Sequence, residues 1–199
     1  MSYPVPKASL ETLYEIKKSK FFACAGMADS RESAMAFLAE IKAQYPDARH
    51  HCWAYILGNP WSPKSAAMSD DGEPSGTAGK PILNVLQHKG VGDIMLVVTR
   101  YFGGIKLGAG GLVRAYSASA QQTMEQLEIV EHISLTPVTV ELDFKHEQYL
   151  RLWTEQHGGK VVTVEYQQQV RMYLAIVDSS LEALQALAAG LGATISMPV

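Results

Sequence analysis

The chain has 199 residues, 47% of them hydrophobic, and a formal net charge of −3 at pH 7. This length can bury the core of one large or two small domains. The charge argues against a broad nucleic-acid-binding surface, because residues up to position 136 carry 13 basic and 13 acidic side chains and the rest carry 4 and 7. Any phosphate binding must therefore depend on local geometry.

The composition predicts a soluble cytoplasmic protein without a membrane partner. The first residues lack the apolar run of a signal peptide, and no stretch approaches the ~20 apolar residues of a spanning helix. Cys24 and Cys52 both lie in apolar, strand-like segments. Two buried thiols are typical of a protein in a reducing compartment.

The apolar pattern up to residue 135 predicts alternating strands and helices. A hairpin comes first, and then a helix that begins with a capping box of Asp29 and Glu32 and ends at Pro46. The segment 58–79 is expected to be one long polar loop. The expected elements are strands at 10–16, 20–27, 49–57 and 93–99, and helices at 29–45, 81–89 and 109–128.

Thr136 and Pro137 mark the expected boundary between two domains, 1–135 and 136–199. Beyond it the pattern predicts the order β-α-β-β-α-β, which is that of ferredoxin-like split βαβ domains. The expected ranges are 138–144, 146–157, 160–168, 171–177, 180–190 and 193–197. The predicted fold class is therefore α+β.

A glycine-rich turn follows the buried strand and precedes a long helix. This is the arrangement in which backbone N–H groups and the positive end of a helix converge on an anion. The turn lacks the Lys-Ser/Thr pair of a Walker loop, and Val113 stands where a dinucleotide fingerprint needs a small residue. The alternative is that the glycines serve only left-handed turns and close packing. Because Lys106 and Arg114 lie nearby, we predict a phosphate or nucleic-acid site of Arg100, Gly103, Gly104, Lys106, Gly108, Gly110, Gly111 and Arg114.

A second polar segment precedes this turn. Asp70, Asp71 and Glu73 are ligands of the type that Mg²⁺ prefers, although Asp and Gly residues also form solvated turns. Alternatively, Arg100 or Lys80 neutralises these carboxylates. No catalytic residue, metal site or cofactor is assigned apart from this Mg²⁺ alternative. The polar motif cluster consists of Arg49, His50, His51, Ser69, Asp70, Asp71, Glu73, Thr77 and Lys80.

His50 and His51 are adjacent on a predicted strand, so their side chains point to opposite faces. This argues against a metal ion shared by both. We expect one to face the core and the other the site, where it is either a general base or a structural residue.

Three segments of the chain resemble the IMPACT family. The segments 47–52 and 69–74 are similar to it, and the likeness covers the whole chain, as in the bacterial YigZ-like branch. The main segment shows, in the family's order and spacing, Gly79, an apolar helix through Leu86, Val91, Val97, Val98, Arg100, Tyr101, Phe102, Gly103, Gly104, Leu107 and Gly108.

The resemblance implies a fold for each domain. For the first it implies the fold of the second domain of ribosomal protein S-five, of the left-handed βαβ class, which also occurs in elongation factor G. For the second it implies a domain similar to another ferredoxin-like module of that factor.

The resemblance also implies a link to translation. Eukaryotic members restrain the kinase of the amino-acid starvation response through an additional N-terminal domain, and the chain begins at the shared domain, so we do not expect the kinase role. We predict a cytosolic regulatory or RNA- or ribosome-associated protein that binds phosphate at the glycine-rich turn and has no catalytic activity of its own. The expected partner is RNA or a ribosome-associated factor, and the acidic second domain is expected to face a protein.

Two alternatives stay open. The first is an enzyme on a small phosphorylated or nucleotide substrate, with Mg²⁺ on the carboxylate cluster and His50 or His51 moving a proton. It requires these side chains to lie together in one closed pocket. The second is a protein-interaction module, which requires a sizeable exposed apolar patch.

Overall fold

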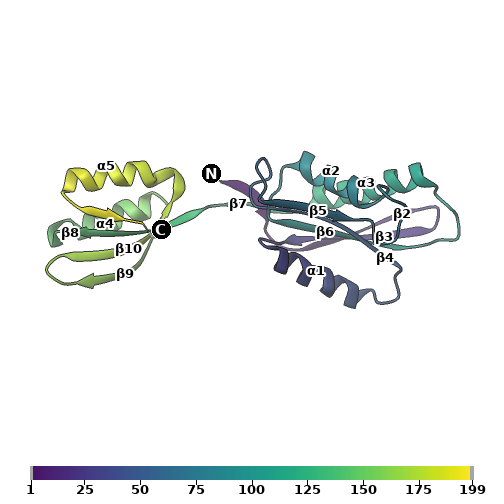
Figure 1. Ribbon diagram of the computed structural model, residues 1–199, viewed down its shortest axis with the longest axis horizontal. Coiled ribbons are helices and arrows are strands. Elements are labelled where there is room, and N and C mark those ends of the chain that lie inside the picture. The colour runs from purple at the N-terminus through teal and green to yellow at the C-terminus, as the bar shows by residue number, and fades with distance from the viewer. Residues whose placement is uncertain (1, 198–199) are drawn as a thin grey trace. The chain divides into compact units, whose positions relative to one another are not determined.

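The computed structural model describes residues 2–197 and divides them into two compact units, residues 2–132 and 133–197. Both units combine helices with antiparallel sheets (Figure 1). The predicted α+β organisation in two domains is confirmed. Within the described residues, no helix is both long enough and apolar enough to cross a membrane.

The first unit is built around a five-stranded antiparallel sheet in the order β2-β3-β6-β4-β5, and β1 pairs separately with β7. In Figure 1, α1 covers one face of this sheet and α2 and α3 cover the other. The elements are β1 Tyr3–Pro6, β2 Leu10–Ile16, β3 Ser19–Met27, α1 Arg31–Gln44, β4 His50–Leu57, β5 Ser65–Ser69, α2 Gly79–Lys89, β6 Ile94–Tyr101, α3 Ala109–Gln126 and β7 Ile129–His132.

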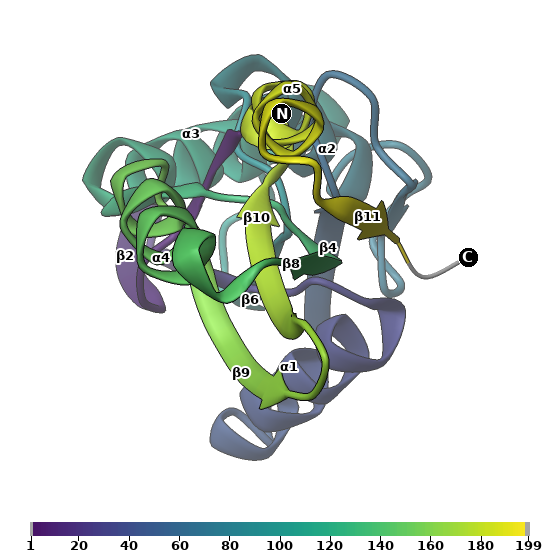
Figure 2. The ribbon, with the colours of Figure 1, turned by 90° about the vertical axis from the view of Figure 1, so that its left-hand side faces the viewer.

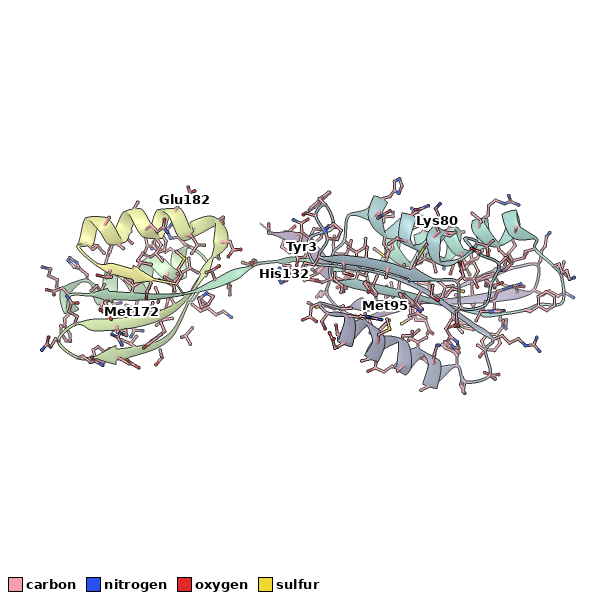
Figure 3. All side chains as sticks on the ribbon, in the orientation of Figure 1. Tyr3, Lys80, Met95, His132, Met172 and Glu182 are labelled. Carbon is pink, nitrogen blue, oxygen red and sulfur yellow. The ribbon has the colours of Figure 1, made fainter. Side chains whose placement is uncertain are left out.

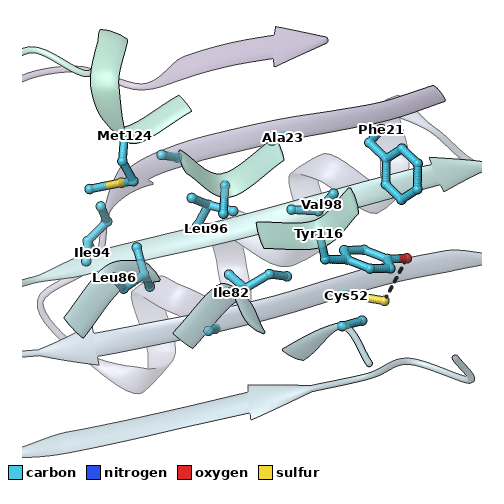
Figure 4. Close-up of a cluster of buried hydrophobic side chains, with 14 of the residues drawn as sticks. Phe21, Ala23, Cys52, Ile82, Leu86, Ile94, Leu96, Val98, Tyr116 and Met124 are labelled. Carbon is cyan, nitrogen blue, oxygen red and sulfur yellow. Dashed lines mark hydrogen bonds between the residues drawn. The ribbon is translucent and has the colours of Figure 1, made fainter. Parts of the chain in front are cut away.

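Two apolar layers stabilise the first unit, one on each face of the sheet. Alternate residues of β6 belong to opposite layers because successive side chains of a strand point to opposite faces. Leu96 packs with Ile82 of α2 and Tyr116 of α3 (Figure 4). Met95 packs with Leu38 of α1 on the other face (Figure 3). The predicted buried strand is therefore the centre of both layers.

The start of α1 differs from the prediction. Ser30 Oγ accepts a hydrogen bond from the Ser33 amide at 3.2 Å, and the Ser30 amide donates to Ser33 Oγ at 3.1 Å. The capping box thus consists of two serines, and its assignment to Asp29 and Glu32 is wrong. A serine hydroxyl is short and can both donate and accept, so a second serine replaces the usual Glu.

The segment 58–79 is not one irregular loop. It contains β5, which pairs with β4 at the edge of the sheet. β5 has a single large apolar residue, Met68, so pairing with β4 rather than its own pattern determines its conformation. The sequence analysis also did not predict β1 and β7. The rings of Tyr3 in β1 and His132 in β7 stack with their centroids 4.8 Å apart (Figure 3).

The second unit has the predicted order β-α-β-β-α-β. Its antiparallel sheet has the strand order β11-β8-β10-β9, and α4 and α5 lie on one face of it (Figure 2). Met172 of the sheet packs with Leu150 of α4 and Leu184 of α5. The elements are β8 Leu135–Leu142, α4 Glu147–Gln156, β9 Lys160–Tyr166, β10 Val170–Val177, α5 Leu181–Leu191 and β11 Thr194–Ser196, with 3-10 turns at Phe144–His146 and Asp178–Ser180.

Two glycines at the turn between β6 and α3 provide a matched test of the fold. A Cβ at Gly103 would lie 2.0 Å from the carbonyl carbon of Lys18, whereas one at Gly110 would have Arg114 Nη1 at 3.5 Å as its nearest neighbour. Because Lys18 contributes backbone, we expect Gly103→Ala to lower the free energy of unfolding by at least about 2 kcal/mol.

Gly110→Ala lies inside a helix and should leave the free energy of unfolding unchanged or raise it by up to about 1 kcal/mol. Urea unfolding measures both changes. Equal stability of the two variants would contradict the close approach of the two backbone segments at Gly103.

Candidate anion-binding site

A pocket of about 510 Å³ lies where β4 begins and β6 ends. His50 and Arg100 are directly opposite each other in the antiparallel pairing of these strands. The two polar segments of the sequence therefore meet at one end of the sheet. The volume is within the range of small-molecule sites. The lining residues are Asp47, Arg49, His50, Arg100, Tyr101, Phe102 and Lys106.

Arg100 forms a buried ion pair behind the pocket. Its Nη1 donates to Glu73 Oε1 at 2.6 Å, and the two side chains are only 10% and 4% exposed. The same carboxylate oxygen accepts from the Tyr116 hydroxyl at 2.8 Å. Cys52 Sγ lies 3.3 Å from that hydroxyl (Figure 4). The sequence analysis left open whether Mg²⁺, Arg100 or Lys80 neutralises the acidic segment. The structure shows the ion pair of Arg100 with Glu73.

The hydroxyl and the thiol beside Glu73 stay protonated. Burial raises the pKa of Tyr116 far above its ordinary value, and the neighbouring Cys52 and Glu73 raise it further. Burial also raises the pKa of the Cys52 thiol to about 12. Because a nucleophilic cysteine needs a lowered pKa, Cys52 is a structural thiol.

One buried nitrogen of Arg100 lacks a partner. Within residues 2–197, Nε is buried and makes no hydrogen bond. The guanidinium carbon lies 5.9 Å from the ring centroid of Phe21 and 5.7 Å from that of Phe102. Buried donors are almost always paired with protein, water or ligand. This unpaired donor belongs to a residue that lines the pocket, so Arg100 is the first candidate there for binding an added acceptor.

The remaining lining residues make the pocket more basic than acidic. Arg49 and Lys106 form no ion pair within 4.0 Å in the described part of the chain. His50 Nδ1 lies 2.8 Å from the Asp71 carbonyl, which fixes the ring. Asp47 is the one carboxylate among these lining residues, and its Oδ1 accepts from the Tyr101 hydroxyl at 2.7 Å. This hydrogen bond raises the pKa of Tyr101 to about 12.

The glycines of the predicted phosphate site have several structural roles. The Gly103 amide donates to Ser19 Oγ at 3.1 Å, so it already has an acceptor. Gly104 and Gly108 have φ values of +86° and +72°, a region that favours glycine. Gly110 and Gly111 lie in the first turn of α3, which has no side-chain cap. Left-handed turns and close packing, the alternative to phosphate binding, thus account for Gly103, Gly104 and Gly108.

Of the predicted phosphate-binding cations, the structure brings Arg100 and Lys106 together at this pocket, whereas Arg114 lies beside Gly110 at the start of α3 and is not among the lining residues. Arg114 lines a separate hollow on α2 and α3, with Val85 and Gln121 among its neighbours. In place of Arg114, the pocket contains Arg49 and His50 from the polar motif cluster.

Asp70 organises the loop that carries Glu73. Its carboxylate accepts from the amides of Gly76 at 2.8 Å, Ala78 at 3.0 Å and Gly79 at 2.8 Å. Burial acts to raise the pKa of Asp70, but these three amides outweigh it and the pKa is lowered. The N-cap residue of α2 is Ala78, whose side chain cannot accept a hydrogen bond from the first amides of the helix. The Asp70 carboxylate accepts these hydrogen bonds instead.

The three carboxylates of the polar segment do not converge. Asp71 Oδ2 accepts from the His51 amide at 2.7 Å, whereas Asp70 binds backbone amides and Glu73 binds Arg100. Within residues 2–197, no three His, Cys, Asp or Glu side chains form a group that could hold a metal ion. The arrangement that the Mg²⁺ alternative requires is therefore not assembled by these side chains.

The other residues of the polar motif cluster have local partners or face solvent. His51 is buried and burial lowers its pKa, while His50 lines the pocket, as the alternation predicts. Ser69 Oγ accepts from the Asp71 amide at 3.2 Å, and Thr77 Oγ1 donates to the Pro74 carbonyl at 2.6 Å.

Lys80 is exposed. It has no carboxylate within 4.0 Å among the residues described. The alternative in which Lys80 neutralises the acidic segment therefore does not hold in the structure.

Sequence reasoning omitted four residues of the site: Asp47, Tyr101, Phe102 and Tyr116. A usable signal existed for Tyr116, which lies on the apolar stripe of its helix, because a buried tyrosine hydroxyl needs a hydrogen-bond partner. Tyr101 and Phe102 follow Arg100 directly in the sequence. Asp47 lies in the segment 47–52 that resembles the IMPACT family, but no chemical argument from the sequence gave it a role.

The ion pair of Arg100 and Glu73 can be tested by comparison with an exposed one. We expect Glu73→Gln to lower the free energy of unfolding by about 3 kcal/mol, because it leaves a buried guanidinium without its counter-charge. Glu128→Gln is the matched control, because Glu128 pairs with Lys7 at 2.8 Å and is 74% exposed. This control should change the free energy of unfolding by less than about 1 kcal/mol. Equal effects in urea unfolding would contradict the role assigned to Glu73.

Comparisons with known proteins cover both units. Residues 17–124 match the family described as the Impact N-terminal domain, and residues 140–191 match a domain of unknown function, DUF1949. A crystal structure described as that of a hypothetical protein is 37% identical, with a TM-score of 0.74, and the match covers 100% of this chain and 98% of that one.

Two bacterial relatives match most of the chain. The Escherichia coli protein named IMPACT family member YigZ is 41% identical over 175 residues, which are 88% of this chain and 86% of that protein. An IMPACT family member of Haemophilus influenzae is 39% identical over 181 residues, or 91% of this chain and 88% of that protein. The chain therefore belongs to the IMPACT family and is a two-domain, YigZ-like member of it.

Proposed function

We propose that this protein is a translation-linked regulatory protein that binds single-stranded RNA through its phosphate backbone at the pocket of Arg100, without catalysis there. The observation that carries the proposal is Arg100 itself. It is nine-tenths buried, it is paired with Glu73, its buried Nε has no partner among the described residues, and it lines a basic pocket.

The chemistry of the pocket favours a phosphate. Arginine presents several N–H donors in a fixed plane, so a guanidinium that is already held on one side loses little conformational entropy on binding a phosphate oxygen. Arg49 and Lys106 add positive charge at the rim. Their lack of ion-pair partners in the described residues means that a phosphate need not displace a protein carboxylate from them.

Phe102 favours a nucleic-acid chain over a free phosphate ion. Its ring is 57% exposed although it lines the pocket beside Arg100. Bases stack on exposed aromatic rings in single-strand-binding proteins, and the neighbouring cations bind the backbone. The family's link to translation, implied by resemblance, supports RNA as the natural ligand.

The enzyme alternative has less support. Each of Asp70, Asp71 and Glu73 already binds a different protein group, and burial keeps the pKa of Cys52 and Tyr116 high. A Mg²⁺-assisted reaction would need at least two of these carboxylates to leave their partners.

We also infer the finer fold classes from the resemblance. The first unit is assigned to the fold of the second domain of ribosomal protein S-five. The second unit is assigned to the ferredoxin-like class, which its strand order β11-β8-β10-β9 supports. Because residues from 137 onward carry 4 basic and 7 acidic side chains, we propose that the second unit contacts a protein rather than phosphate. The two free cysteines are consistent with a cytoplasmic location.

Binding to a fluorescent single-stranded RNA of about 12 nucleotides, measured by anisotropy between about 50 and 200 mM salt, tests the proposal. We expect modest affinity with a shallow salt dependence. Lys106→Ala and Arg49→Ala should each weaken binding several-fold and reduce the slope of log affinity against log salt by about one.

Lys64→Ala is the matched control. Lys64 is exposed, and its amide donates to the carbonyl of Leu57, at the end of β4 opposite to His50. Removing this charge should leave the affinity and the slope nearly unchanged. If Lys106→Ala and Lys64→Ala have the same effect, RNA does not bind at this pocket.

A further inference from the structure

We infer that Asp47 makes this pocket select RNA over DNA, by accepting a hydrogen bond from the 2′-hydroxyl of the ribose whose phosphate lies on Arg100. The inference rests on the proposed phosphate binding at the same pocket. It gives a chemical reason why the pocket would bind RNA more tightly than DNA.

The position of Asp47 is fixed by its neighbours. Its Oδ1 accepts from the hydroxyl of Tyr101, the residue that follows Arg100 in β6. The Tyr101 ring packs against the rings of Tyr45 and Phe22, with distances between ring centroids of 6.3 Å and 6.0 Å. Oδ2 of Asp47 makes no hydrogen bond or ion pair with any residue of the described chain. One oxygen of a held carboxylate is therefore available to a ligand.

A carboxylate in a phosphate site is unfavourable unless the ligand also brings a donor. It repels the phosphate and reduces the attraction from Arg49 and Lys106, which line the same pocket. The repulsion is offset only if a hydrogen-bond donor lies close to the phosphate in the ligand. Asp47 therefore indicates a ligand in which a phosphate and a hydroxyl or amino group are neighbours.

The ribose 2′-hydroxyl is the donor that every nucleotide of RNA carries beside its phosphate and that DNA lacks. Acidic side chains accept a hydrogen bond from this hydroxyl in dinucleotide-binding folds as well. With DNA, Asp47 would face the backbone without a donor and would disfavour binding. Specificity of this kind combines an attractive contact to one partner with repulsion of the other.

A base amino group is the competing donor. Carboxylates accept from the amino group of cytosine, which would make the affinity depend on sequence and not on the sugar. The two possibilities separate cleanly, because oligonucleotides of one sequence can be made with different sugars.

The experiment compares RNA, DNA and 2′-O-methyl RNA of the same sequence, in oligo-C and oligo-U versions, by anisotropy at low salt, because cytosine carries an amino group and uracil does not. We expect RNA to bind roughly tenfold more tightly than DNA, since a hydrogen bond to a charged group is commonly worth about that factor. The 2′-O-methyl RNA, whose sugar oxygen has no proton to donate, should bind like DNA. The preference should be the same for oligo-C and oligo-U.

Two variants and a control assign the preference to Asp47. Asp47→Asn keeps the shape of the side chain and removes its charge, so DNA binding should strengthen and the RNA preference should fall towards one. Tyr101→Phe removes the hydroxyl that positions Asp47 without changing the net charge, and it should reduce the preference as well. Glu32→Gln in the first turn of α1 is the charge control and should change RNA and DNA binding equally.

Each result decides a different question. If RNA and DNA bind equally while Lys106→Ala weakens both, the phosphate site stands and the inference about Asp47 is overturned. It is also overturned if the preference survives Asp47→Asn, or if it follows the base instead of the sugar. If Lys106→Ala has no effect on either nucleic acid, the proposed function fails and the inference fails with it.

Discussion

The buried ion pair between Arg100 and Glu73 is the interaction on which the candidate site depends. It joins the end of the central strand β6 to the loop before α2, and Tyr116 of α3 adds a hydrogen bond to the same carboxylate oxygen. Charges as buried as these are tolerated only when they are paired and hydrogen-bonded. The pair therefore constrains a strand, a loop and a helix to one arrangement, and it fixes the Arg100 side chain beside the pocket.

This arrangement gives the residues of the two polar segments separate roles without invoking catalysis. Asp70 caps α2 through three amides and so positions the loop, and Glu73 on that loop holds Arg100. The residues exposed to a ligand are instead Arg49, Lys106 and Phe102 at the rim. A neutral domain can bind phosphate in this way because Arg49 and Lys106, which have no ion-pair partner among the described residues, line the same pocket as Arg100.

Much of the fold, but only part of the site, could be predicted from the sequence. The apolar run of β6 and the opposite orientations of His50 and His51 follow from local periodicity. The choice of Glu73 over Asp70 and Asp71 as the partner of Arg100 does not, because it depends on how the loop folds back on β6. Likewise, the capping of α1 depends on hydroxyl geometry, and β5 exists because β4 offers it an edge. Arg114 lies beside Gly110 at the start of α3, but the pocket of Arg100 does not include it.

The most direct measurement is a crystal structure of the protein with a short single-stranded RNA. We expect a phosphate oxygen within hydrogen-bond distance of the Arg100 guanidinium, about 3 Å, with Lys106 or Arg49 on the same phosphate and a base on the Phe102 ring. An RNA bound elsewhere, with the Arg100 pocket free of phosphate, would contradict the assignment of this pocket as the RNA-binding site.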